Sequence, residues 1–254
     1  MAAQLPRHAP FTIRRFLITI SPNMGVLADH VVSDAAVSVL AQTLRVTEIF
    51  FSLQGETSRV GLPTVFVRLT GCPLRCGYCD TAYAFHGGTS LTLKQILSDV
   101  SSYRTRYVTV TGGEPLAQKN CPALLTELAD RGYSVSLETG GALDVSQVDA
   151  RVSRILDIKT PGSGEAEKNL WSNLGHLTAR DEIKFVLCSE ADYEWAKQVL
   201  AERGLDAICP VLFSPSHHDL PAQTLAGWIL RDALPVRMQV QLHKQLWGDE
   251  ARGR

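Results

Sequence analysis

The chain has 254 residues, and its 25 basic and 26 acidic side chains give a formal net charge of -1. Such a balance, without a stripe of Lys or Arg, provides no electrostatic footprint for nucleic acid or for an anionic membrane. Apolar residues occur only in runs well below the roughly 20 that span a bilayer. We therefore expect a soluble, cytoplasmic protein that acts on a small molecule, with no nucleic acid or membrane partner.

The N-terminal segment differs in composition from the rest of the chain. Before Asp29 it contains no acidic residue but three arginines, a bias that also occurs in organelle transit peptides. A poorly ordered extension, or a start codon assigned too early, is the simpler explanation. We expect residues 1–45 to be such an extension and residues 46–254 to form the catalytic domain.

From residue 46 onward, short runs rich in Val, Ile and Leu alternate with apolar residues at helical spacing. The predicted strands are 64–69, 107–111, 133–137, 155–158, 183–187, 207–213 and 236–242. The predicted helices are 93–100, with Thr92 and Gln95 spaced as a capping box, 122–131, 191–203 and 221–232. This alternation predicts an α/β fold with a parallel sheet, either open or part of a barrel.

Polar and glycine-rich motifs come directly after these strands. They occupy residues 71–81, 112–115, 138–141, 159–162 and 214–216. Because the carboxyl ends of parallel strands share one rim, motifs far apart in sequence are expected to converge there on one site.

Three cysteines lie close together in the first of these motifs. Cys72, Cys76 and Cys79 occupy a loop whose glycines and proline disfavour a regular helix. Structural zinc and iron–sulfur clusters usually take four protein ligands, so three thiols suggest a cluster with one open iron. The alternatives are a zinc site completed by a distant residue such as His86, or three buried structural thiols. Inert core cysteines are not expected in a loop rich in Gly and Pro.

The other three cysteines are isolated in the sequence. Cys121, Cys188 and Cys209 are typical of ordinary core or surface positions. The six cysteines could be counted as three disulfides. Because the chain has no secretory signal pattern, we instead expect a reducing compartment, in which the thiols stay free.

The cysteine spacing, with Tyr78 before the last thiol, resembles the radical S-adenosylmethionine enzymes. In that family three thiolates hold a 4Fe-4S cluster whose fourth iron binds the amino and carboxylate groups of S-adenosylmethionine. Reduction of the cluster then cleaves S-adenosylmethionine to a 5'-deoxyadenosyl radical. The resemblance implies a full or partial (β/α) barrel with the cluster on the rim, and here we expect the partial barrel.

The segment from Gly112 to Pro115 resembles the family's Gly-Gly-Glu motif, which binds the methionine amino group. Two glycines allow the backbone to approach a ligand closely, and Glu114 offers an anionic acceptor to an ammonium. Taken alone, the segment could be a plain turn. Thr81, two residues after the last thiol, offers a hard oxygen suited to Mg²⁺, although a hydrogen-bonded loop threonine is the alternative.

Further motifs narrow the resemblance to the 7-carboxy-7-deazaguanine synthases, over roughly residues 45–250. They are Gln54-Gly-Glu56, Phe66-Val-Arg-Leu-Thr-Gly71, Tyr78-Cys-Asp-Thr81, Thr111-Gly-Gly-Glu-Pro115, Glu138-Thr-Gly-Gly141 and Gln239-Val-Gln-Leu-His-Lys244. Members convert 6-carboxy-5,6,7,8-tetrahydropterin to 7-carboxy-7-deazaguanine with loss of ammonia, on the pathway to queuosine. S-adenosylmethionine is regenerated in each turnover.

The resemblance also implies roles for individual residues. The substrate would contact Leu53, Gln54, Gly55, Glu56, Arg68 and Thr111. S-adenosylmethionine would contact Tyr78, Cys79, Asp80, Gly113, Glu114, Asp157, Lys159 and Ser214. Arg68 and Glu56 would be catalytic, with the Arg68 fork matching the substrate carboxylate. Cys72, Cys76 and Cys79 would hold the 4Fe-4S cluster, and Thr81 would bind Mg²⁺.

The chain departs from the family pattern in two places. Some members carry Ser-Pro-Lys where this chain has Asp157-Ile-Lys159, and some place their terminal carboxylate near the substrate, whereas this chain continues to Arg254. The resemblance further implies a reduced flavodoxin- or ferredoxin-like electron donor and a homodimer. Two alternatives stay open, an activase that installs a radical on a partner protein and a zinc-binding interaction module.

Overall fold

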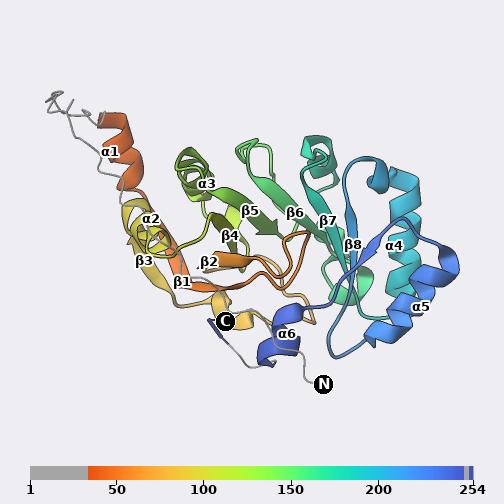
Figure 1. Ribbon diagram of the computed structural model, residues 1–254. Coiled ribbons are helices and arrows are strands. Elements are labelled where there is room, and N and C mark those ends of the chain that lie inside the picture. The colour runs from red at the N-terminus through yellow and green to blue at the C-terminus, as the bar shows by residue number, and fades with distance from the viewer. Residues whose placement is uncertain (1–33, 249–251, 254) are drawn as a thin grey trace, which may run out of the picture. The chain divides into compact units, whose positions relative to one another are not determined.

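The computed structural model describes residues 34–248, 252 and 253, and these belong to one compact unit. Within them, nine strands form a single sheet in the order β3-β1-β2-β4-β5-β6-β7-β8-β9 (Figure 1). The strands are β1 (Thr43–Leu53), β2 (Pro63–Leu69), β3 (Thr89–Thr92), β4 (Tyr107–Gly112), β5 (Ser134–Thr139), β6 (Ser153–Ile158), β7 (Glu182–Leu187), β8 (Val211–Pro215) and β9 (Arg237–Met238). Since β3 and β9 are two separate ends, the sheet is open, and the fold is the expected partial barrel.

β2 pairs with β4 in parallel, and each strand from β4 to β9 pairs in parallel with the next, as the alternation of elements predicts. Their interior residues, such as Val65, Val67, Val108 and Val110, are fully buried. Strands with such buried interiors need apolar runs, which explains why they are recognisable in the sequence. The covering helices are α2 (Leu93–Ser101), α3 (Cys121–Asp130), α4 (Glu190–Arg203) and α5 (Ala222–Asp232). None of the described helices is long and apolar enough to cross a bilayer.

The ends of the helices follow their local sequence. At the start of α2, the Thr92 hydroxyl accepts a hydrogen bond from the Gln95 backbone N–H, and the Gln95 side-chain oxygen accepts one from the Thr92 backbone N–H. This pair confirms the predicted capping box. Helix α4 begins after Ser189, whose hydroxyl accepts from the Asp192 backbone. It ends at Gly204, which has the left-handed conformation that glycine adopts easily.

Two strands were not predicted, and both pair antiparallel. β1 pairs with β2 on one side and with β3 on the other. β1 begins at Thr43, and Leu44 is only 1% exposed. The expected boundary between residues 45 and 46 therefore falls inside a core strand, and helix α1 (Asp34–Leu40) precedes it. The rest of the expected extension, residues 1–33, lies outside the described residues.

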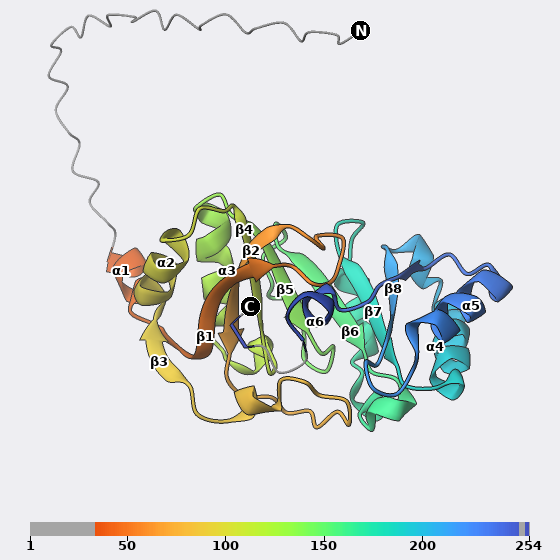
Figure 2. The same cartoon turned by 60° about the horizontal axis from the view of Figure 1, so that its bottom comes forward.

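Two predicted strands are shorter than expected. Ala207 ends a short 3-10 helix (Leu205–Ala207) and residues 208–210 connect it to β8, while β9 has two residues in place of the predicted 236–242. After β9 the chain leaves the sheet, because the backbone N–H of Leu242 donates to the Gly55 carbonyl at 3.0 Å. Helix α6 (Leu242–Trp247) follows. In Figure 2 this helix lies in front of the middle strands, and its flanking residues line the cavity described next.

Candidate active site

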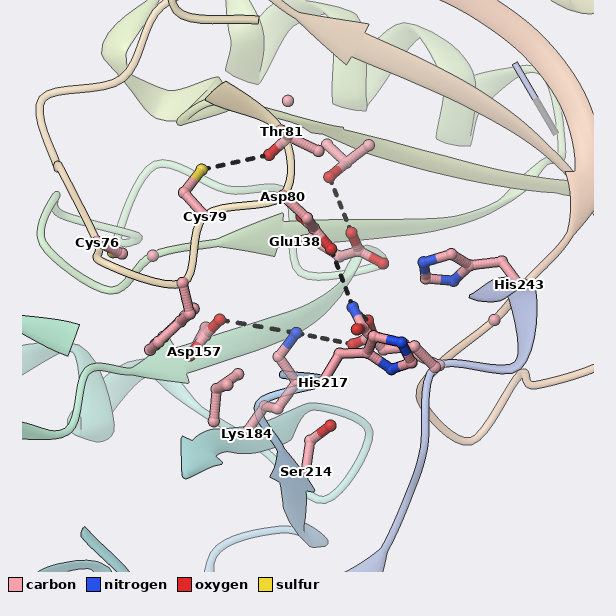
Figure 3. A pocket seen from close by; sticks show the side chains of 18 of the residues that line it. Cys76, Cys79, Asp80, Thr81, Glu138, Asp157, Lys184, Ser214, His217 and His243 are labelled. Carbon is pink, nitrogen blue, oxygen red and sulfur yellow. Dashed lines mark hydrogen bonds and ion pairs between the residues drawn. The ribbon is translucent and has the colours of Figure 1, made fainter. Parts of the chain in front are cut away.

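A cavity of about 560 Å³ opens at the carboxyl ends of the parallel strands. The strand ends, the loop that carries the three cysteines, and residues 241–244 around the start of α6 form its wall (Figure 3). Every site residue expected from the sequence lines this cavity except Glu114. The expected residues that line it are Leu53, Gln54, Gly55, Glu56, Arg68, Cys72, Cys76, Tyr78, Cys79, Asp80, Thr81, Thr111, Gly113, Asp157, Lys159 and Ser214.

The cysteine loop is held by hydrogen bonds to the segment after β6. The backbone N–H of Gly77 donates to the Ser163 carbonyl at 3.0 Å, and the backbone N–H of Arg75 donates to Glu165 Oε1 at 2.6 Å. Cys72, Cys76 and Cys79 are all half-buried and free of disulfide bonds. The three thiols therefore face one cavity on a loop fixed from outside, which fits a cluster held by three cysteines.

Burial raises the pKa of the Cys72 and Cys76 thiols in the absence of metal. A bound iron would reverse this, because coordination requires the thiolate. His86, the fourth ligand considered for a zinc site, is exposed and is not among the residues that line the cavity. The arrangement therefore fits the cluster better than the zinc alternative.

Gly113 fits tightly against the start of the cysteine loop. A Cβ atom on Gly113 would come within 2.2 Å of the Gly71 carbonyl oxygen and 2.8 Å of Cys72 Cβ. The backbone N–H of Glu114 donates to the same Gly71 carbonyl at 2.8 Å. Only glycine allows this approach, so the end of β4 places the cysteine loop directly.

Glu114 is the expected site residue that does not line the cavity. It is fully buried, and each carboxylate oxygen already accepts a backbone N–H, from Leu116 at 3.0 Å and from Gly140 at 2.7 Å. The Thr139 hydroxyl donates to the same group. The carboxylate thus joins the ends of β4 and β5 beneath the cavity, and its expected contact with a ligand ammonium has no support in this geometry.

Two buried polar atoms on the cavity wall have no hydrogen-bond partner among the described residues: the Tyr78 hydroxyl and Asp157 Oδ1. The other Asp157 oxygen pairs with Lys159 Nζ at 3.0 Å. Burial without a partner costs free energy, so such atoms mark places where a bound ligand can supply the missing contact. Both residues are among those expected to contact S-adenosylmethionine, so the unsatisfied atoms fit a polar cofactor on this side.

Arg68, at the end of β2, is oriented by neighbours on β1. Its Nε donates to Glu48 Oε1 at 2.7 Å, and its guanidinium lies 5.6 Å from the ring centre of Phe50 and 5.8 Å from that of Tyr83. The Tyr83 hydroxyl donates to the same Glu48 oxygen. No acceptor among the described residues meets the two terminal nitrogens of Arg68. These nitrogens are therefore free to receive a carboxylate bidentately.

Another part of the wall carries two carboxyl groups whose pKa values are shifted in opposite directions. Burial would raise the pKa of Glu56, but Lys184, 2.8 Å away, and a hydrogen bond from Gln241 lower it to about 2. Burial also raises the pKa of Glu138, and the nearby Glu56 charge adds to the effect. Glu138 accepts from the Thr111 hydroxyl at 2.8 Å. Glu56 therefore holds its negative charge more readily than Glu138 does.

Thr81 and Asp80 connect the cysteine loop to the residues around α6. The Thr81 hydroxyl is 3.8 Å from Cys79 Sγ, so it lies beside the thiols (Figure 3). Asp80 pairs with Lys244 Nζ at 3.2 Å and accepts from the Gln241 side chain at 3.2 Å. These contacts draw the C-terminal segment across the mouth of the cavity.

Four residues with evident parts in this site were not assigned a role from the sequence: Glu48, Glu138, Lys184 and His243. Lys184 and Glu138 carried a usable signal, because each interrupts an apolar, buried strand with a charge, and buried charges need partners. His243 packs on Gly55, where a Cβ atom would meet its ring at 2.3 Å. Glu48 carried no signal, because its strand was not recognised.

Comparison with known proteins agrees with this site. The model of the Radical SAM superfamily matches residues 66–205. The chain is 48% identical over 213 residues to the 7-carboxy-7-deazaguanine synthase of Chlorobaculum tepidum, covering 83% of this chain and 97% of that protein. It is 40% identical over 225 residues to that of Koribacter versatilis, covering 83% and 100%.

A solved structure has the same fold. The crystal structure of QueE from Escherichia coli matches with a TM-score of 0.67 at 24% identity, covering 83% of this chain and 99% of that one. These comparisons favour the synthase over the activase and over the zinc-binding module. The chain belongs to the 7-carboxy-7-deazaguanine synthase family of the Radical SAM superfamily.

Proposed function

We propose that this chain is a lyase that converts 6-carboxy-5,6,7,8-tetrahydropterin to 7-carboxy-7-deazaguanine with release of ammonia, in queuosine biosynthesis. The observation that carries the proposal is one cavity of about 560 Å³ lined by sixteen of the seventeen expected site residues, in a chain 48% identical to a synthase of that name. The volume is within the usual range of small-molecule sites.

The cysteine side of the cavity would hold the cofactors. Cys72, Cys76 and Cys79 would hold a 4Fe-4S cluster, and Tyr78 and Asp157 would bind S-adenosylmethionine through their unsatisfied oxygens. When bound, the two cofactors would supply the radical chemistry that removes a hydrogen atom from C6 of the substrate. The fixed loop and the cover of residues 239–247 would exclude water from this reaction.

The opposite side would hold the pterin. The terminal nitrogens of Arg68 would bind the substrate carboxylate, while the Glu56 carboxylate would accept hydrogen bonds from N–H groups of the ring. Backbone groups of Leu53, Gln54 and Gly55 line the same wall, and Thr111 lies next to Glu138. This division gives each ligand its own set of charges within one cavity.

Mg²⁺ would bind at Thr81, between the thiols and the expected place of the substrate carboxylate. Support comes from the position of the Thr81 hydroxyl beside Cys79 and from the affinity of Mg²⁺ for oxygen ligands. We further propose a reduced flavodoxin- or ferredoxin-like electron donor, a homodimer, a cytoplasmic location and a catalytic domain that starts near the beginning of the sheet.

Anaerobic turnover tests the function. The cluster-loaded protein is incubated with the carboxytetrahydropterin, S-adenosylmethionine, a reductant and Mg²⁺, and the products are analysed. We expect 7-carboxy-7-deazaguanine and ammonia in equal amounts. Cys76→Ala should give neither product and should lose iron, whereas Cys209→Ala, at a buried position away from the cavity, should match the wild type. Cleavage of S-adenosylmethionine with an unchanged pterin would contradict the proposal.

A further inference from the structure

A buried lysine lies between the two proposed halves of the cavity. Lys184 is on β7, its side chain is 14% exposed, and its Nζ is 2.8 Å from Glu56 Oε2 and 3.6 Å from Asp157 Oδ2 (Figure 3). Asp157 in turn pairs with Lys159. Glu56, Lys184, Asp157 and Lys159 therefore form a row of alternating charges that runs from the proposed substrate side to the proposed cofactor side.

The surroundings of Glu56 explain why this lysine matters. The side chains of Gln241 and Gln239 donate to Glu56 at 2.9 and 3.3 Å, but both are neutral. Lys184 is the one cation that hydrogen-bonds to Glu56 within the described part of the chain.

Other ionisable groups face Glu56 from the surrounding elements. They are Glu138 on β5, Asp157 on β6, Arg68 on β2 and His243 on α6. The two carboxyl groups oppose a negative charge on Glu56 where they are ionised. The pKa of His243 is lowered by burial, so the imidazole favours its neutral form. Arg68 pairs with Glu48 instead, so Lys184 is the main counter-charge to Glu56.

We propose that Lys184 is a positioning residue for the pterin: its ammonium holds the Glu56 carboxylate as an anion and fixes its orientation on the cavity wall, so that Glu56 accepts hydrogen bonds from the substrate ring. The inference rests on the proposed function and deepens it. Lys184 acts through Glu56, and its second pair, with Asp157, ties the substrate side of the wall to the cofactor side.

The physical consequence can be followed through the protonation of Glu56. With Lys184 present, the pKa of Glu56 is about 2, so the group is an anion at any working pH. Without it, burial and the neighbouring Glu138 raise the pKa. Below the new pKa the carboxyl is neutral and one of its oxygens carries a proton, so it accepts fewer hydrogen bonds; above that pKa the anion returns. Substrate affinity should then rise with pH, with a slope of up to about tenfold per pH unit.

The test is calorimetric titration of the carboxytetrahydropterin into cluster-loaded protein with S-adenosylmethionine bound, from about pH 6 to about pH 9, relative to the pH response of the wild type. We expect K184M to bind at least about tenfold more weakly at the acid end and to recover as the pH rises. K184R, which keeps the charge, should retain the wild-type pH response. K184Q serves in place of K184M if the Met variant loses its fold, judged by melting temperature and iron content.

K197M is the matched control, because Lys197 also pairs with two carboxylates, those of Glu194 and Asp232, but does not line the cavity. Its substrate affinity should show the wild-type pH response. E56Q should bind more weakly at every pH, and adding K184M to E56Q should introduce no further pH dependence. An unaltered pH response in K184M, or an equal change in K197M or in the E56Q background, would overturn the proposal.

The outcomes also separate this inference from the function on which it rests. If the wild type neither binds nor converts the pterin, the proposed function fails and the role of Lys184 fails with it. If the wild type binds and converts the pterin and K184M keeps its pH response, only the role of Lys184 is refuted.

Discussion

Arg68 illustrates how a single side chain acquires its direction from residues that the sequence does not connect to it. Its type and place on a strand could be matched to a carboxylate ligand from the motif alone. Its orientation depends on Glu48 of β1 and on Tyr83, which follows the cysteine loop. One oxygen of Glu48 accepts hydrogen bonds from both Arg68 and Tyr83. Residue type was therefore predictable, and the contacts that aim the group were not.

Arg68→Lys tests the bidentate contact. Lysine keeps one positive charge but loses the planar fork and the Nε–H that meets Glu48, so substrate affinity should fall by about 2 kcal/mol. Binding of S-adenosylmethionine should not change. The measurement is calorimetric titration of both ligands. Arg106→Lys, at an exposed site away from the cavity, is the control. Equal substrate affinity in Arg68→Lys and the wild type would show that Arg68 does not bind the substrate carboxylate.

Thr81→Ala tests the proposed Mg²⁺ position. Alanine cannot offer an oxygen ligand, so the variant should keep its iron and still cleave S-adenosylmethionine, while losing most of the rate increase that Mg²⁺ gives the wild type. Initial rates with and without Mg²⁺ provide the measurement. Thr81→Ser, which retains the hydroxyl, should respond to Mg²⁺. If Mg²⁺ stimulates Thr81→Ala as much as the wild type, the cation binds elsewhere.

At the scale of the elements, predictability followed burial. Strands β2, β4 and β7 bury most of their residues and stand out as apolar runs. β1 lies near the edge of the sheet and alternates exposed Thr43 and Arg45 with buried Leu44 and Val46, so its start lacks the continuous apolar run that marks the more buried strands. Helix α6 could not be predicted, because its position depends on a contact with Gly55, far away in the sequence.

Gly113→Ala tests how β4 positions the cysteine loop. The added methyl would collide with the Gly71 carbonyl, a backbone atom that cannot rotate away, so the loop must shift. We expect a lower melting temperature and less bound iron after reconstitution. Gly227→Ala is the matched control, because this exposed glycine of α5 has nothing within 4 Å of its added Cβ. It should keep its iron and gain up to about 1 kcal/mol of stability from helix propensity. Normal iron content in Gly113→Ala would contradict the account.

At the scale of the whole molecule, the convergence of distant motifs on one rim was predictable from parallel topology alone. The side-chain pairs that connect the walls of the cavity could not be predicted from topology. Lys184 and Glu56 are 128 residues apart, and Gln241 and Glu56 are 185 apart. Whether two such residues meet depends on the exact curvature of the sheet and the path of the last segment, which no local pattern encodes.

Two truncations test the N-terminal boundary of the catalytic unit. Deleting residues 1–33 should leave turnover and melting temperature unchanged, because among the described residues the cavity lining starts at Phe50 and the sheet starts at Thr43. Deleting residues 1–44 removes buried Leu44 and its pairing with β3, so the protein should melt at a lower temperature even where activity survives. A loss of activity in the shorter deletion would show that residues 1–33 contribute to the enzyme, and equal melting temperatures for both would place the boundary later.

The central claim is that one cavity holds both S-adenosylmethionine and the pterin, close enough for a hydrogen atom to pass between them. Turnover of a substrate deuterated at C6, followed by mass spectrometry of the recovered S-adenosylmethionine, tests it most directly. We predict that deuterium appears in S-adenosylmethionine as 7-carboxy-7-deazaguanine forms, and that Cys76→Ala shows neither. Formation of the product with no deuterium in S-adenosylmethionine or in 5'-deoxyadenosine would contradict the shared cavity.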